Sequence, residues 1–147
     1  MNYNTGDYGS KKKLGIWMDH SIAYLMEFTT SAFEIKTIES RFSEQKKLLT
    51  LSKSDSSMYS KEQQKLFKYY KKISEVIIEY KKVILFGPST AKLELFDFLA
   101  EDKQFIKIKF EIQNTDEMTR DQKNSFVMNM FFTKSTLKAQ NNNLVNN

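Results

Sequence analysis

Residues 82–99 decide the fold, and they read Lys82-Val83-Ile84-Leu85-Phe86-Gly87-Pro88-Ser89-Thr90-Ala91-Lys92-Leu93-Glu94-Leu95-Phe96-Asp97-Phe98-Leu99. The continuous apolar run at 83–86 is typical of a strand that is covered on both faces. Gly87 and Pro88 end this strand, and Pro88 is the only proline of the chain. The stretch therefore predicts a central, buried strand followed by a sharp turn.

A helix is expected directly after this turn. Ser89 or Thr90 can cap its first turn, because hydroxyl side chains accept hydrogen bonds from free backbone amides. The spacing predicts that it buries Leu93, Phe96 and Leu99. A strand that passes into a helix through so short a turn is half of a βαβ crossover, so the sheet should contain a parallel pair of strands.

Three apolar segments precede this unit, at 14–18, 21–28 and 32–39. Their connections are short, which favours an antiparallel meander. The third segment alternates apolar and polar residues and so has one polar face. We therefore expect it at an edge of the sheet.

The remaining segments complete the expected domain. Residues 40–59 lack a periodic pattern and predict a long loop. A helix is expected over 61–81, opened by a capping box at Ser60–Gln63. Residues 105–112 alternate and predict the other edge strand. A second capping box, at Thr119–Gln122, predicts a last helix whose inward residues are Phe126, Val127, Met130 and Phe131.

The element order is thus β-β-β-α-β-α-β-α, which gives an α/β domain with a five-stranded mixed sheet. The strand order 3-2-1-4-5 is the simplest arrangement that places both half-polar strands at the edges. We expect one domain at 13–132, a disordered leader at 1–12 and a disordered tail at 133–147, because both ends of the chain are polar.

Composition limits the classes of function. The 147 residues include no cysteine and 1 histidine, so a disulfide framework and a cysteine- or histidine-based metal site are not expected. No run of about eighteen apolar residues predicts a membrane span. Without the apolar core of a signal peptide, the expected compartment is the cytoplasm. The net charge of +5 allows a polyanionic partner, and no cofactor is expected.

Two local motifs carry a resemblance to a known family. The first is Gly15-Ile16-Trp17-Met18-Asp19-His20 with Ala23, and the second is Val83-Ile84-Leu85-Phe86-Gly87-Pro88-Ser89-Thr90-Ala91-Lys92 with Phe96. With the element order, they resemble the ribonuclease H-like group called translational machinery components. This group includes the middle domain of peptide-chain release factors, Pelota and small bacterial single-domain relatives.

The resemblance implies a translation-associated module that contacts the ribosome or a structured RNA. Release factors act through a Gly-Gly-Gln tripeptide between the third strand and the first long helix. The corresponding residues 40–59 contain no glycine. Catalytic residues are therefore not carried over, and peptidyl-tRNA hydrolysis by that mechanism is not expected.

Basic residues supply the candidate nucleic-acid surface. They occupy the long loop and the helix after it, and the set is Lys46, Lys47, Lys53, Tyr59, Lys61, Lys65, Lys68 and Lys72. Such a patch would meet RNA phosphates, and its binding would fall steeply with salt. The alternative is a solvated lysine face, which long helices commonly carry.

Ser89, Thr90 and Lys92 form a second candidate site, for an anion at a helix N-terminus. The alternative is a tight turn with an ordinary cap. The segment lacks the several glycines of a P-loop.

Two further hypotheses belong to other classes. Asp19 on the first strand invites a two-metal nuclease site, but convincing carboxylate partners are missing, and a turn role is the alternative. His20 is interpreted as structural, because no nucleophile accompanies it. The other hypothesis is a protein–protein module that self-associates through an exposed edge strand, at Phe33–Ile38 or Ile106–Ile112, to give a homo-oligomer.

Overall fold

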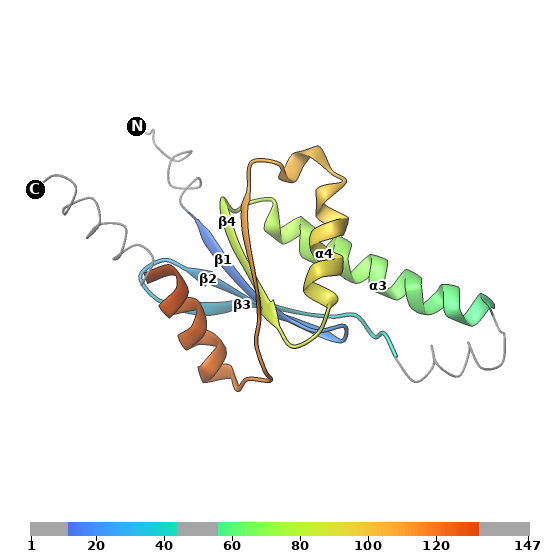
Figure 1. Ribbon diagram of the computed structural model, residues 1–147, viewed down its shortest axis with the longest axis horizontal. Coiled ribbons are helices and arrows are strands. Elements are labelled where there is room, and N and C mark those ends of the chain that lie inside the picture. The colour runs from blue at the N-terminus through green and yellow to red at the C-terminus, as the bar shows by residue number, and fades with distance from the viewer. Residues whose placement is uncertain (1–11, 44–55, 133–147) are drawn as a thin grey trace, which may run out of the picture.

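The computed structural model describes residues 12–43 and 56–132, with side chains from residue 60 onward in the second range. Its centre is a five-stranded sheet in the order β3-β2-β1-β4-β5 (Figure 1). The strands are β1 (Lys13–Met18), β2 (Ile22–Phe28), β3 (Ala32–Glu39), β4 (Lys82–Gly87) and β5 (Lys109–Asn114).

The pairing of the strands follows the sequence prediction. β1, β2 and β3 form an antiparallel meander, and β4 lies parallel to both β1 and β5. The predicted α/β class, the mixed sheet of ribonuclease H-like type and the strand order 3-2-1-4-5 are confirmed. β3 and β5 are the two edges, as their half-polar patterns predicted.

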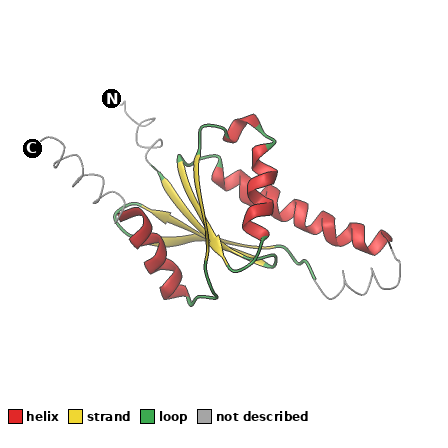
Figure 2. Cartoon of the chain, viewed as in Figure 1, coloured by secondary structure: helices red, strands yellow, loops and turns green. Residues whose placement is uncertain are grey.

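Helices cover both faces of the sheet (Figure 2). α3 (Ser56–Ile77) and α4 (Ala91–Ala100) pack on one face, and the helix at residues 120–132 packs on the other. Two apolar clusters result, one on each side of the sheet. The central strand β4 serves both clusters, because Val83 and Leu85 point to one side and Ile84 and Phe86 to the other. This explains why the run at 83–86 is apolar throughout.

The turn after β4 has a conformation that requires glycine. Gly87 has a φ of 143°, and a Cβ added there would overlap the carbonyl oxygen of Met18. α4 then begins at Ala91, whose backbone N–H donates to the Ser89 hydroxyl. Thr90 is the N-cap residue but makes no side-chain cap hydrogen bond. Ser89 thus supplies the hydroxyl that the sequence assigned to either residue.

The prediction for the helix after the Gly87-Pro88 turn needs one correction. Leu99 is buried and Phe96 packs against the core, but Leu93 is exposed. Leu95 takes the buried position instead, one turn before Leu99.

The long helix is displaced from its predicted bounds of 61–81. It begins at Ser56 and ends at Ile77, so Ser60–Gln63 lies inside the helix and does not cap it. The Glu62 carboxylate accepts a hydrogen bond from the Ser43 N–H and pairs with Lys65. The apolar stripe predicted for the long helix is present in α3, where Leu66, Tyr69, Ile73 and Ile77 are buried.

The strand predicted at 105–112 is also shifted. Residues 103–105 form a short 3₁₀ helix, which Asp102 caps by accepting from the Gln104 N–H. β5 starts only at Lys109 and runs to Asn114, where it pairs with Gly87. Ile106, one of the apolar residues of the predicted alternation, is 81% exposed. The alternation at 105–108 is therefore realised as a turn, not as an edge strand.

The second capping box is confirmed. The Thr119 hydroxyl accepts from the Gln122 N–H, and the Gln122 side chain accepts from the Thr119 N–H. The helix then buries Val127 and Phe131. Of the loop predicted at 40–59, residues 56–59 belong to α3 instead, and 44–55 lie outside the described residues. The leader predicted at 1–12, apart from Lys12, and the tail predicted at 133–147 also lie outside them. Within the described ranges, no helix is long and apolar enough to cross a membrane.

Candidate functional site

Four of the predicted RNA-contact lysines lie on α3. Lys61, Lys65, Lys68 and Lys72 are spaced i, i+4, i+7 and i+11, which places them along one side of the helix. We call these four residues the lysine stripe. Lys61, Lys68 and Lys72 are exposed, whereas Lys65 pairs with Glu62 at 2.7 Å. Three members of the stripe therefore have solvent-exposed side chains.

The stripe ends in a region of balanced charge. A cavity of about 510 Å³ lies between α3 and β3, and its lining includes Lys36, Lys72, Glu39 and Glu75. Opposite charges at this end reduce the local positive potential. The more basic part of the stripe is thus its beginning, toward Lys61. Of the other predicted members, Lys46, Lys47, Lys53 and the side chain of Tyr59 lie outside the described residues.

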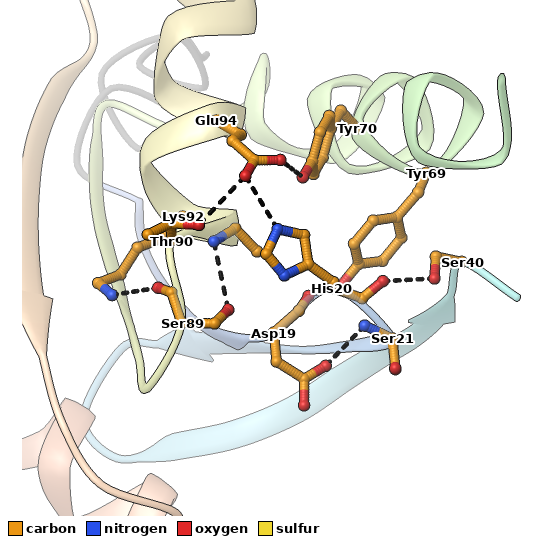
Figure 3. A network of polar contacts seen from close by, with 11 residues as sticks. Asp19, His20, Ser21, Ser40, Tyr69, Tyr70, Ser89, Thr90, Lys92 and Glu94 are labelled. Atoms are coloured by element: carbon orange, nitrogen blue, oxygen red, sulfur yellow. Dashed lines mark hydrogen bonds and ion pairs between the residues drawn. The ribbon is translucent and has the colours of Figure 1, made fainter. Parts of the chain in front are cut away.

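A polar network joins the end of β1, the inner part of α3 and the first turn of α4 (Figure 3). Glu94 is its centre: it accepts from the Tyr70 hydroxyl at 2.7 Å and from the Thr90 hydroxyl at 3.1 Å. The His20 ring nitrogen Nε2 lies 3.0 Å from the same carboxylate. On the other side of His20, the Tyr69 hydroxyl donates to the Asp19 carbonyl oxygen. The network therefore anchors both helices to the end of β1.

Three groups of this network, Tyr69, Tyr70 and Glu94, have pKa values shifted away from neutral pH. Burial would raise the pKa of Glu94, but hydrogen bonds from His20, Tyr70 and Thr90 outweigh it and hold the pKa below its ordinary value. Burial raises the pKa of Tyr69 and Tyr70 well above the usual range of phenols. Both tyrosines thus remain protonated hydrogen-bond donors. Glu94 and the two tyrosines are therefore suited to positioning rather than to proton transfer near neutral pH.

The candidate anion site is occupied by internal contacts. The Lys92 ammonium donates to the Ser89 carbonyl oxygen, and Lys92 is 1% exposed. The Thr90 hydroxyl is directed to Glu94, which puts a carboxylate in the first turn of α4. Burial lowers the pKa of Lys92. Ser89, Thr90 and Lys92 do come together, and their geometry is that of a capped turn. Anion binding there stays a prediction.

Asp19 has the contacts of a turn residue. Its Oδ1 accepts from the backbone N–H groups of Ser21 and Ile22, at 2.7 and 2.9 Å. In the described part of the chain, no group of three or more Asp, Glu or His side chains is arranged to hold a metal ion. No observation there supports the nuclease hypothesis.

The structure shows a buried lysine, Lys123, that the sequence interpretation did not identify as a candidate site residue. Lys123 is 8% exposed, and its Nζ lies 3.6 Å from the ring centroid of Tyr24 and 4.1 Å from that of Trp17. Nearby, the Arg120 Nε lies 3.5 Å from a Glu34 carboxylate oxygen. One sequence signal existed: Lys123 precedes Val127 and Phe131 at i, i+4 and i+8, so a lysine occupies the apolar stripe of the helix.

Comparisons with known proteins show the fold. No protein-family model matches this sequence, and no curated protein matches it. The Pelota protein of Archaeoglobus fulgidus is similar in structure, with a TM-score of 0.55 at 10% sequence identity over 96% of this chain and 39% of that protein. An archaeal translation termination factor is similar with a TM-score of 0.54 at 13% identity, over 90% of this chain and 40% of that protein.

The chain therefore spans less than half the length of either protein. At these identities the likeness is one of fold, and it matches the fold that the two sequence motifs indicated. Pelota and the termination factor both contain a domain built like this chain.

Proposed function

We propose that this chain is a non-catalytic, translation-associated module that docks on the ribosome through the lysine stripe of α3. The observation that carries the proposal is the structural likeness to an archaeal translation termination factor over 90% of the chain. The exposed lysines supply the contact chemistry, and the proposed compartment is the cytoplasm. A structured RNA outside the ribosome would present the same phosphates.

The geometry of the stripe suits an RNA backbone. A helix rises about 1.5 Å per residue, so Lys61 and Lys72 stand about 16 Å apart along α3. Lysine side chains bind phosphates as flexible point charges, without base specificity. The stripe would therefore position the module on RNA and not read its sequence.

Chemistry at the peptidyl-tRNA is not part of this proposal. The chain contains 4 glycines, at positions 6, 9, 15 and 87, so no two are adjacent. A Gly-Gly-Gln tripeptide is thus absent from the sequence. The side chains around Glu94 form hydrogen bonds with one another, and nothing in their arrangement resembles a substitute for the catalytic tripeptide.

The test is binding to purified ribosomes at increasing salt, measured by co-sedimentation. The variant Lys61→Gln/Lys68→Gln/Lys72→Gln should bind at least about tenfold more weakly near 0.1 M salt. The slope of log affinity against log salt should fall by about 0.7–0.9 for each phosphate that the variant no longer neutralises. Glutamine keeps the helix propensity, so the fold should be unaffected.

A matched control removes the same charge elsewhere. Lys103, Lys107 and Lys109 are exposed at or before the start of β5, and their replacement by glutamine should leave ribosome binding nearly unchanged. An equal loss of ribosome affinity in both triple variants would mean that binding depends on the net charge of the chain and not on the lysine stripe. Salt-insensitive binding of the unaltered chain would contradict phosphate recognition altogether.

A second candidate function is self-association through β3, and one observation favours it. β3 is an edge strand, and its Phe33 and Ile35 side chains are 43% and 40% exposed. Edge strands with exposed apolar residues readily pair with another strand. If two copies pair there, Ile35→Lys should convert a dimer to a monomer in analytical ultracentrifugation. A monomeric unaltered chain at high concentration would eliminate this candidate.

A further inference from the structure

A pocket opens on the face of the sheet opposite α3 and α4. It lies between β2, β3 and the first turns of the helix at residues 120–132, and its volume is about 330 Å³. Its polar lining comes from Glu34, Arg120, Lys123 and Asn124, and Tyr24 and two methionines complete the wall. This pocket shares no residue with the lysine stripe or with the network around Glu94.

Lys123 is the main reason to regard the pocket as a binding site. Its side chain is more than nine-tenths buried, and its ammonium group is held against the faces of Trp17 and Tyr24. Among the described residues, no oxygen accepts a hydrogen bond from this ammonium and no carboxylate forms an ion pair with it. Two aromatic faces satisfy at most two of its three N–H donors. At least one donor thus remains for a ligand in the pocket that Lys123 lines.

Charge in the pocket is arranged asymmetrically. Arg120 lines the same space with its side chain 73% exposed, and it is 3.5 Å from Glu34. Burial lowers the pKa of Lys123, and the nearby positive charge of Arg120 also lowers it. Three carboxylates act in the opposite direction and raise this pKa, those of Glu117, Asp19 and Glu34. Of the lining side chains, two are cationic and one is anionic. The lining side chains thus carry one net positive charge, and Glu117 and Asp19 lie outside the lining but within electrostatic range of Lys123.

Asn124 adds a second unsatisfied group. Its Oδ1 is buried and has no hydrogen-bond partner among the described residues, and Asn124 lines the pocket beside Lys123. A buried polar atom without a partner costs free energy, and such atoms commonly mark a missing ligand or water. An oxygen acceptor requires an O–H or N–H donor on whatever fills the pocket.

We propose that this pocket binds a small anion that carries a hydrogen-bond donor next to its charge. The charged group binds between Lys123 and Arg120, and the neighbouring O–H or N–H donates to Asn124 or Glu34. Hydroxycarboxylates, aminocarboxylates and hydrogen phosphate share this chemistry. The apolar wall of Tyr24, Met26 and Met118 leaves space for a short carbon chain.

The single tryptophan of the chain provides the readout. Trp17 contacts the Lys123 ammonium, so a ligand that draws on this ammonium should change the indole fluorescence. The experiment titrates the full chain with glycolate or with inorganic phosphate, at constant ionic strength set with chloride. We expect a saturable change with one of the two, and the one that saturates identifies a carboxylate or a phosphate ligand.

Matched probes and variants test each part of the proposal. Acetate and sulfate lack a donor at neutral pH, so acetate should bind at least about threefold more weakly than glycolate, or sulfate than phosphate, according to which of the two saturates. Lys123→Met should reduce the affinity at least about tenfold, and this variant is titrated by calorimetry because it lacks the ammonium on which the Trp17 signal depends. Arg120→Gln alters an exposed side chain, keeps the fold and should weaken binding about threefold.

Lys107→Gln, remote from the pocket, should leave the titration unchanged. The absence of a saturable change with both glycolate and phosphate would overturn the proposal. So would an Arg120→Gln titration identical to that of the unaltered chain. Equal affinity for the probes with and without a donor would overturn the role given to Asn124.

Discussion

Replacement of Gly87 by alanine is expected to lower the free energy of unfolding by about 3–5 kcal/mol. Two costs combine at this position. The φ of 143° is one that side chains with a Cβ rarely adopt. The new Cβ would also overlap the Met18 carbonyl oxygen, which belongs to the backbone of β1 and cannot rotate away. Since domains are stable by only about 5–15 kcal/mol, the variant should be near the limit of folding.

Urea unfolding followed by circular dichroism measures this loss. Pro88→Ala is the control, because it alters the same turn, adds no atom near β1 and should cost about 1 kcal/mol or less. If Gly87→Ala were as stable as Pro88→Ala, that result would contradict the inference that the end of β4 lies too close to the end of β1 to admit a Cβ. The contact matters because β1 and β4 are neighbouring central strands, and both contribute buried residues to the two apolar clusters.

The sheet was predictable because its signals are local and agree with one another. Four apolar residues between Lys82 and Gly87 admit few arrangements other than a covered strand, and the short links at 19–21 and 29–31 favour antiparallel neighbours. Right-handed crossovers then restrict where β4 and β5 lie. Each of these rules uses only a strand and the segments directly before and after it, and needs no information from the rest of the chain. The same rules explain why the likeness to Pelota and the termination factor was already visible in the element order.

The two capping boxes show where local signals fail. Thr119–Gln122 and Ser60–Gln63 have the same pattern, yet only the first caps a helix. At Ser60 the upstream residues 56–59 are themselves helical, so no free amide remains there for the hydroxyl. The Glu62 side chain instead bonds to Ser43, which is 19 residues away. A long-range contact of this kind cannot be inferred from spacing.

The start of β5 fails for a related reason. The alternation at 105–112 is compatible with a strand, but α4 ends at Ala100 and Asp102 then caps a further turn. Phe105 is buried in the α3 and α4 cluster by that turn, which leaves Ile106 exposed. Tertiary packing thus outweighs the strand pattern for four residues.

The candidate sites were only partly accessible from sequence. The spacing of Lys61, Lys68 and Lys72 places them on one side of a helix whatever its bounds. The pocket around Lys123 depends instead on strand register: Trp17 and Tyr24 lie opposite each other in the β1–β2 pairing. Because local patterns do not determine this register, the two rings were not paired beforehand, and a lysine between them was not expected.

The helix at residues 120–132 should respond strongly to a change on the strand beneath it. Gly15 lies in the middle of β1, and a Cβ added there would overlap Cγ2 of Val127. Gly15→Ala is therefore expected to cost about 2–3 kcal/mol, because the helix must move away from the sheet. Val127→Ala alone should cost about 2 kcal/mol through reduced burial and a small cavity.

The double variant distinguishes this contact from a general defect. With Val127 shortened to alanine, the nearest remaining atom is its Cβ, 3.3 Å from the Cβ added at Gly15, so little overlap persists. The two losses should then fail to add, with a coupling of about 1–2 kcal/mol in a double-mutant cycle from urea unfolding. Additive losses would mean that the helix does not rest on Gly15. Because Lys123 lies on the same helix, Gly15→Ala should also shift the Trp17 fluorescence, whereas the double variant should restore it.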